Sequence, residues 1–208
     1  MAIEDKEIIL LKVSGQDKPG VTAGLTSILA NYDAVILDIG QADIHDTLSL
    51  GILFQIKAGS SSAPVLKDLL FKGYELGIKV KFIPITIPDY EKWVKAQRKQ
   101  RYIINVLGES LTAAQLAAVT KIMSDQNLNI DSIIRLTGRT SIVDKEEYPR
   151  SCVQLSVTGE IKNKSLMTAN FMAISSEFDV DISFQEDNMY RRNRRLVCFD
   201  MDSTLIQT

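Results

Sequence analysis

Residues 7–31 read EIILLKVSGQDKPGVTAGLTSILAN, and this stretch decides the fold of the first half of the chain. Residues 7–14 form an apolar run of strand length, so they predict a buried strand. The segment from Gly15 to Gly20 breaks this run, and Pro19 stands where proline favours the first turn of a helix. From residue 19 onward the apolar residues recur at helical spacing, which predicts an amphipathic helix over 19–31.

The rest of the first unit completes a recognisable order of elements. A second strand is expected over 35–44 and a turn at 45–47, and strict alternation of apolar residues over 48–56 predicts a third strand with one buried face. A second helix is expected to open at Pro64 and to end at Gly77, before a fourth strand. The order strand–helix–strand–strand–helix–strand predicts a ferredoxin-like unit, in which helices cover one side of a four-stranded antiparallel sheet.

The same order begins again in the second half of the chain, with an offset of roughly 95 residues. Strands are expected over 102–107, 130–136, 152–158 and 180–184, and helices over 112–126 and 165–178. We therefore predict an α+β protein with a first domain at 1–88, a polar linker at 89–100, a second domain at 101–188 and a tail at 189–208. The linker is expected to include a short helix capped by Asp89.

The composition narrows the class of protein. Hydrophobic residues make up 45% of the chain and charged residues 24%, and the formal net charge is -2, which is typical of a globular protein without general affinity for nucleic acid. Cys152 and Cys198 lack the spacing of a metal site, and no apolar run has the length of a signal peptide or a membrane span. We expect a cytoplasmic protein that binds neither membrane nor nucleic acid. His45 is expected in a turn, where a surface or packing role is favoured over ligation.

The loop from Asp17 to Thr22 is a candidate ligand site. A helix N-terminus offers unpaired N–H groups and a partial positive charge to a carboxylate, and Gly20 lets a ligand approach the backbone closely. Asp17 could pair with an ammonium group, so the loop suits a free amino acid. The alternative is ordinary turn chemistry, in which Pro19 and Gly20 form a turn and Asp17 is the helix N-cap.

The strand, the segment Gly-x-Asp-Lys-Pro-Gly-Val-Thr ending at Thr22, and the helix that follows resemble an ACT domain. ACT domains are allosteric modules that bind amino acids, usually at domain or subunit interfaces. The resemblance implies a homodimer and an amino-acid ligand held by the following residues: Asp17, Pro19, Gly20, Val21 and Thr22. The matching loop of the second unit lacks the Asp-x-Pro-Gly signature, so Gly108 and Glu109 are its only candidates. The second unit could instead build the interface that completes the first site.

The tail contains a second chemical signature. Residues 196–208 read LVCFDMDSTLIQT, in which an apolar strand leads into Asp200 and Asp202. A carboxylate beyond the end of a strand can attack phosphorus to give an aspartyl phosphate, and a second carboxyl group can donate a proton to the leaving oxygen. Two anions beside a phosphate favour a divalent cation with oxygen ligands, and Mg²⁺ fits this role.

The segment Phe199–Thr204 resembles the Asp-x-Asp-x-Thr motif of the haloacid dehalogenase superfamily, and its sequence, Phe-Asp-Met-Asp-Ser-Thr, is similar to that of phosphoserine phosphatases. The resemblance implies that Asp200 is the nucleophile and Asp202 the general acid/base, with the Asp200 carboxylate and the Asp202 carbonyl binding Mg²⁺. It implies O-phospho-L-serine as the substrate and L-serine, the product, as the ligand sensed. The chain ends four residues after Thr204, so we expect it to contain only the first strand of a truncated α/β phosphatase domain and to show no turnover. Residues 189–208 are expected to be mobile or to pair as a strand with another chain.

Two other classes compete with this interpretation. One is a non-enzymatic tandem-ACT regulator similar to the repressor of the glycine cleavage system, which would not need the Asp-x-Asp-x-Thr segment. The other is an RNA-binding module of the same fold, which would stack bases on aromatic residues of its sheet. The predicted strands are mainly aliphatic, and aromatic residues make up only 7% of the chain, which disfavours RNA binding.

Overall fold

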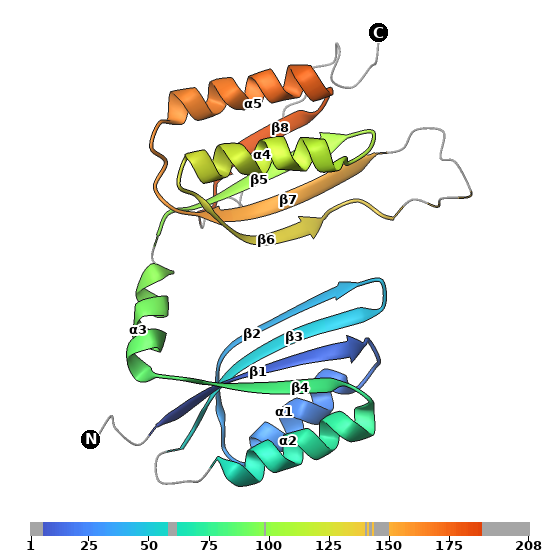
Figure 1. Ribbon diagram of the computed structural model, residues 1–208, viewed down its shortest axis with the longest axis vertical. Helices are drawn as coiled ribbons and strands as arrows, with labels where there is room; N and C mark the ends of the chain where they lie inside the picture. Colours follow the sequence, from blue (N-terminus) through green and yellow to red (C-terminus); the bar gives the residue numbers. More distant parts are fainter. Residues whose placement is uncertain are drawn as a thin grey trace. The chain divides into compact units, whose positions relative to one another are not determined.

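The structure is a computed structural model that describes residues 6–57, 62–97, 99–139, 141, 143 and 150–188. Its contacts divide the chain into two compact units, residues 1–95 and 96–208. Each unit is a four-stranded antiparallel sheet with two helices on one face, so the predicted α+β class and the tandem ferredoxin-like architecture are confirmed (Figure 1). No helix in the described ranges is both long and apolar enough to cross a membrane.

The first unit has the predicted order of elements. They are β1 (Glu7–Gln16), α1 (Val21–Asn31), β2 (Val35–Ile44), β3 (Thr47–Ile56), α2 (Ala63–Leu76) and β4 (Lys79–Ile85). The sheet order is β2-β3-β1-β4, so β1 is hydrogen-bonded on both sides, with Leu11 opposite Ile52 of β3 and Phe82 of β4. The predicted boundaries hold closely, because Pro64 opens α2 and Gly77 ends it in a left-handed conformation.

The core of the first unit lies between the helices and one face of the sheet. The alternate residues of β1 and β3 that face the helices are buried, as are the inward residues Leu25 of α1 and Leu69 of α2. A polar contact joins the two helices, because the Tyr32 hydroxyl donates a 2.6 Å hydrogen bond to the Asp68 carboxylate. This hydrogen bond raises the pKa of Tyr32.

The turn between β2 and β3 places a backbone acceptor next to the β1–α1 loop. His45 and Asp46 both have positive φ angles, as in the two-residue hairpin turns whose twist matches that of antiparallel strands. This confirms the predicted turn and gives His45 a conformational role. The Asp46 carbonyl accepts a 2.8 Å hydrogen bond from the Asp17 N–H, so the hairpin holds the start of the loop.

The second unit repeats the first. Its elements are β5 (Arg101–Gly108), α4 (Ala113–Asp125), β6 (Asn129–Arg135), β7 (Ser151–Thr158), α5 (Lys164–Phe178) and β8 (Asp181–Glu186), and its sheet order is β6-β7-β5-β8. Its core is formed by buried residues on the strands and helices that correspond to those of the first unit, among them Ile104 of β5, Leu155 of β7 and Met167 of α5. Stacked Tyr102 and Phe184 rings, 5.1 Å apart, extend this core between β5 and β8.

The segment between the units begins with a helix, α3 (Ile87–Ala96), two residues earlier than the predicted linker. Asp89 is not the N-cap that the sequence predicted. Thr86 caps the helix, because its hydroxyl oxygen accepts a 3.2 Å hydrogen bond from the Asp89 N–H. The Asp89 carboxylate in turn accepts from the Thr86 hydroxyl at 2.7 Å, so Asp89 supports the cap from the third helical position. Much of the polar connection 138–150 and all of 189–208 lie outside the described residues.

Two helical glycines give a matched test of the packing. A Cβ on Gly73 of α2 would lie 2.5 Å from Val80 Cγ2, whereas the atom nearest to a Cβ on Gly24 of α1 would be the flexible end of Lys72, at 3.0 Å. We expect Gly73→Ala to lower the free energy of unfolding by about 1–3 kcal/mol through overpacking. Gly24→Ala should leave it unchanged or raise it by up to about 1 kcal/mol, because alanine favours helix.

Urea unfolding followed by circular dichroism measures both variants. Adding Val80→Ala to Gly73→Ala should restore part of the loss, because it removes the atom that the new methyl group meets. Equal stability of the Gly73→Ala and Gly24→Ala proteins would contradict this account of the α2–β4 contact.

Candidate functional site

The β1–α1 loop folds as a tight turn centred on Pro19 and Gly20. The Lys18 carbonyl accepts from the Val21 N–H at 3.4 Å, and Gly20 has φ 94° and ψ -9°. Proline followed by a residue with positive φ is the arrangement of a type II turn, in which glycine avoids the strain of a side chain. A Cβ on Gly20 would meet nothing within 4 Å, so this glycine is required by backbone conformation and borders open space.

The start of α1 has no side-chain cap. Gly20 is the N-cap residue, its carbonyl accepts the first helical bond from Gly24 at 2.8 Å, and no side-chain hydrogen bond caps the helix. The alternative interpretation of Asp17 as the N-cap is therefore wrong. Backbone donors and the positive end of the helix dipole remain available at this terminus.

Neighbouring residues fix the loop but leave its outer side exposed. The Asp17 N–H is bound by the Asp46 carbonyl, as described above, while the Asp17 side chain is exposed. The Thr22 hydroxyl donates to Gln41 Oε1 at 3.2 Å, which connects the first turn of α1 to β2. Val21 is buried in the core, so its side chain anchors the helix start rather than facing a ligand. Gln41 was not predicted to contact the loop. It lies on β2, 19 residues from Thr22, and no sequence motif marks it.

The loop presents an exposed carboxylate and an uncapped helix start within a few residues of each other. Exposed Asp17 offers an anionic partner for an ammonium group, and the uncapped helix start at Gly20 offers N–H donors for a carboxylate. Pro19 and Gly20 are both exposed, so nothing within the loop itself covers this approach. The arrangement has the chemistry to bind a small zwitterion.

The corresponding loop of the second unit is closed by its own side chains. Thr112 is the N-cap of α4, and its hydroxyl accepts from the Gln115 N–H at 3.2 Å, while Gln115 Oε1 accepts from the Thr112 N–H at 2.8 Å. Gln115 is buried and also donates to the Phe178 carbonyl at 3.3 Å. This capping box binds N–H groups at the start of α4, whereas the equivalent N–H groups at the start of α1 have no side-chain partner. The two loops therefore differ chemically.

Gly108 has a packing role in the second unit. A Cβ there would lie 3.1 Å from Val180 Cγ1, and the equivalent Gly15 in the first unit would place a Cβ 2.9 Å from Ile78 Cγ2. The two glycines therefore let the end of a central strand pass close to the residue before the last strand. Glu109 is exposed beside Gly108, and the helix that follows it, α4, begins at the side-chain cap Thr112.

The predicted catalytic and metal-binding residues, Asp200 and Asp202, lie outside the described residues. Among the residues that are described, no three His, Cys, Asp or Glu side chains gather closely enough to hold a metal ion. Cys152 is half-buried and free, and burial raises the pKa of its thiol, which lowers its reactivity.

Comparison with known proteins identifies both units. Residues 7–83 and residues 101–185 each match a family described as an ACT domain. A phosphoserine phosphatase of Streptomyces coelicolor is 30% identical over 203 residues, which are 98% of this chain and 46% of that protein. The chain thus spans about half the length of this curated relative.

Two further similarities concern the ACT units themselves. A UPF0237 protein of Methanopyrus kandleri is 36% identical over 72 residues, which are 34% of this chain and 80% of that protein. A solved structure titled as a candidate glycine cleavage system transcriptional repressor has a TM-score of 0.60 at 14% identity, over 88% of this chain and 98% of that one. At this identity the structural likeness supports the tandem fold alone.

The left-handed conformation at Gly20 gives a testable requirement. We expect Gly20→Ala to lower the free energy of unfolding by about 1 kcal/mol or more, because a non-glycine residue at this φ angle is strained. Gly40 of β2 is the matched control, since a Cβ there also meets nothing within 4 Å and its φ angle is not positive.

Thermal and urea unfolding of the two variants make the comparison. Gly40→Ala should be neutral or slightly stabilising, because it reduces the freedom of the unfolded chain. A Gly20→Ala protein as stable as the Gly40→Ala protein would mean that the turn relaxes without cost.

Proposed function

The chain belongs to the ACT domain family, and we propose that its two ACT domains are the amino-acid-sensing, regulatory portion of a phosphoserine phosphatase. The observation that carries the proposal is the similarity to the Streptomyces phosphoserine phosphatase, which covers 98% of this chain. The assignment of Asp200 and Asp202 as catalytic residues depends separately on the resemblance of residues 199–204 to the Asp-x-Asp-x-Thr motif. The proposal therefore rests on the ACT pair and the Asp-x-Asp-x-Thr segment together.

L-serine is the proposed ligand of the first ACT domain, because it is the product of phosphoserine hydrolysis. Its carboxylate would accept from the uncapped N–H groups at the start of α1, and its ammonium group would pair with Asp17. Regulation requires that the ligand bind two states of the enzyme with different affinity. Because the second helix start is closed by Thr112 and Gln115, we propose one such site for each chain.

The proposed reaction converts O-phospho-L-serine and water into L-serine and phosphate. The Asp200 carboxylate attacks phosphorus and Asp202 protonates the departing serine oxygen, after which Asp202 accepts a proton from the water that hydrolyses the aspartyl phosphate. Mg²⁺ bound by the Asp200 carboxylate and the Asp202 carbonyl would offset the negative charge that gathers there. We further propose that the protein is a cytoplasmic homodimer.

Thermal unfolding in the presence of amino acids tests the ligand. At a hundred times its dissociation constant, a ligand adds about 2.7 kcal/mol to the stability, which shifts the midpoint by several degrees. We expect this shift with L-serine, and little with D-serine or L-phenylalanine. Asp17→Asn should weaken binding about tenfold or more, because a hydrogen bond to a charged group contributes about 1.5–3 kcal/mol.

Glu109→Gln is the matched control, because it removes the equivalent acidic group from the capped loop of the second unit. It should leave the L-serine shift unchanged. A loss of the shift in Glu109→Gln but not in Asp17→Asn would transfer the site to the second unit, and no shift with L-serine in the parent chain would reject L-serine as the ligand.

Activity of the full-length gene product tests the enzyme. We expect phosphate release from O-phospho-L-serine, reduced by at least about a thousandfold in Asp200→Asn, as for loss of a catalytic nucleophile. Asp131→Asn on exposed β6 is the control and should retain activity. Amino-acid binding without any phosphatase activity would instead favour a non-enzymatic tandem-ACT regulator.

A further inference from the structure

Helix α2 is apolar on two sides, although only one side faces the core of its unit. Val65, Leu69 and Gly73 are buried against the sheet. On the opposite flank Leu70 is 52% exposed, Phe71 60% and Tyr74 87%. A helix that is covered on one side only normally presents charged or polar residues to solvent, so this second apolar face indicates a further contact.

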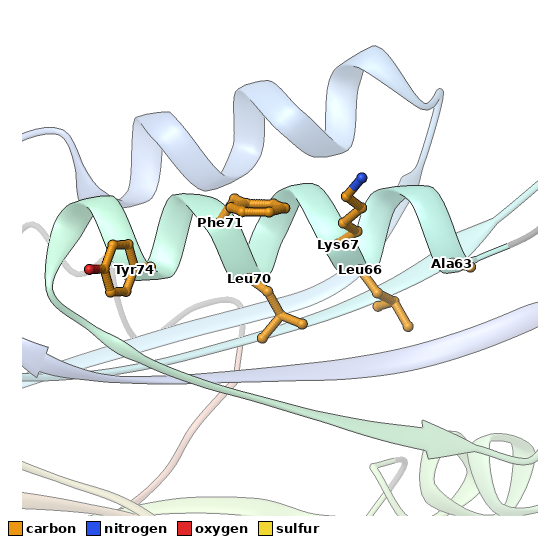
Figure 2. Close-up of a pocket in the computed structure, with 6 residues that line it drawn as sticks. All are labelled: Ala63, Leu66, Lys67, Leu70, Phe71 and Tyr74. Atoms are coloured by element: carbon orange, nitrogen blue, oxygen red, sulfur yellow. The ribbon is translucent and has the colours of Figure 1, made fainter.

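Six residues of α2, all exposed except the half-buried Leu66, form one surface, here called the outer α2 face. Figure 2 shows them along one flank of the helix, where they line a hollow of about 620 Å³ formed by Ala63, Leu66, Lys67, Leu70, Phe71 and Tyr74. The Lys67 ammonium lies 5.7 Å from the centre of the Phe71 ring. Leu66 also lines an adjoining hollow with Phe82, Pro84 and Ile85, so the apolar surface continues onto β4.

The second unit shows that the fold does not need this surface. The left-handed C-caps Gly77 of α2 and Asp179 of α5 set the alignment of the two helices. In this alignment the residues of α5 that correspond to Leu66, Leu70, Phe71 and Tyr74 are Thr168, Met172, Ala173 and Ser176. Three large apolar or aromatic side chains of the first unit thus have small or polar counterparts, and only Met172 keeps an apolar one of similar size.

We propose that the outer α2 face is a dimer interface, which packs antiparallel against α2 of a second copy of this chain. The face is self-complementary, as an interface with two-fold symmetry must be. Leu66 and Tyr74 stand four residues on either side of Leu70, so a two-fold axis near Leu70 places each Leu66 beside the partner's Tyr74.

The charges at the edge of the face are compatible with the same antiparallel arrangement, with their centre one residue further along the helix. Lys67 and Glu75 stand four residues on either side of Phe71, so the antiparallel arrangement brings each Lys67 near the Glu75 of the partner subunit. A parallel arrangement would instead place like charges together. An aromatic and aliphatic centre with charged residues at its rim is the usual anatomy of a specific interface.

This inference specifies the homodimer of the proposed function, and it is tested by a separate measurement. Sedimentation equilibrium of the 208-residue chain, from about 1 to about 100 µM, should show a dimer that dissociates on dilution. Leu70→Asp should weaken dimerisation at least about tenfold, because it places a charge at the centre of the contact. Met172→Asp is the matched control at the equivalent position of α5, and it should leave dimerisation unchanged.

Charge reversal tests the antiparallel orientation. Lys67→Glu and Glu75→Lys should each weaken the dimer, and the double variant should restore it. The 3.0 Å Lys72–Glu75 ion pair is exposed and contributes little to stability, so its loss in Glu75→Lys should not obscure the result. Restoration in the double variant supports the antiparallel pairing, and failure to restore it overturns that pairing.

Circular dichroism shows whether each variant is folded, and the amino-acid thermal shift tests the ligand site separately from the dimer interface. A Leu70→Asp protein that is folded and monomeric supports the interface, whatever amino acid the loop binds. A parent chain that is monomeric throughout the concentration range, or a Leu70→Asp protein that remains dimeric, overturns it. Absence of a shift with any amino acid in a dimeric protein would reject only the proposed function.

Discussion

The central strand of each sheet is the constraint on which the rest of the structure depends. β1 is hydrogen-bonded to β3 on one side and to β4 on the other, and it carries buried side chains toward both helices. Because its side chains alternate between the two faces, a shift of one residue would expose the whole core. The register also fixes where β1 ends, and hence where the loop from Gly15 to Gly20 meets the hairpin turn at Asp46. The position of the candidate site is thus a consequence of strand pairing.

The two units share this framework but differ at the one point where a helix begins after the central strand. Gly15 and Gly108 are equivalent, and both allow close approach to the residue before the last strand. Five residues after Gly15, the first unit has an uncapped Gly20, whereas four residues after Gly108 the second unit has Thr112 in a capping box. Both units share the packing glycine. They differ in capping, because the helix start of the first unit has no side-chain hydrogen bond and that of the second unit is capped by Thr112 and Gln115.

The order of elements could be predicted from sequence because each element carries a local signal. Alternation in residues 48–56, Pro64 at the start of α2 and Gly77 at its end gave strand and helix boundaries close to those observed. The capping of α1 could not be predicted in the same way, because the path of the β1–α1 loop depends on a tertiary contact, the hydrogen bond from the Asp17 N–H to the Asp46 carbonyl. Gln41 was missed for the same reason, since it reaches Thr22 only through the placement of β2. The role of Gly108 likewise depends on Val180, 72 residues further along the chain.

The absence of a side-chain cap on α1 links stability to ligand binding. A Thr or Asp cap typically contributes about 1 kcal/mol to a helix, and the second unit has this contribution through Thr112 whereas the first does not. A capping side chain at Gly20 would occupy the same N–H groups that a ligand carboxylate needs, so the first unit cannot have both. The left-handed φ angle of Gly20 favours an uncapped helix start, because it turns the chain sharply while leaving the space in front of the helix open. A carboxylate ligand that supplies the missing hydrogen bonds would therefore stabilise the folded first unit directly, which is the thermodynamic requirement for a domain that senses a small molecule through its own stability.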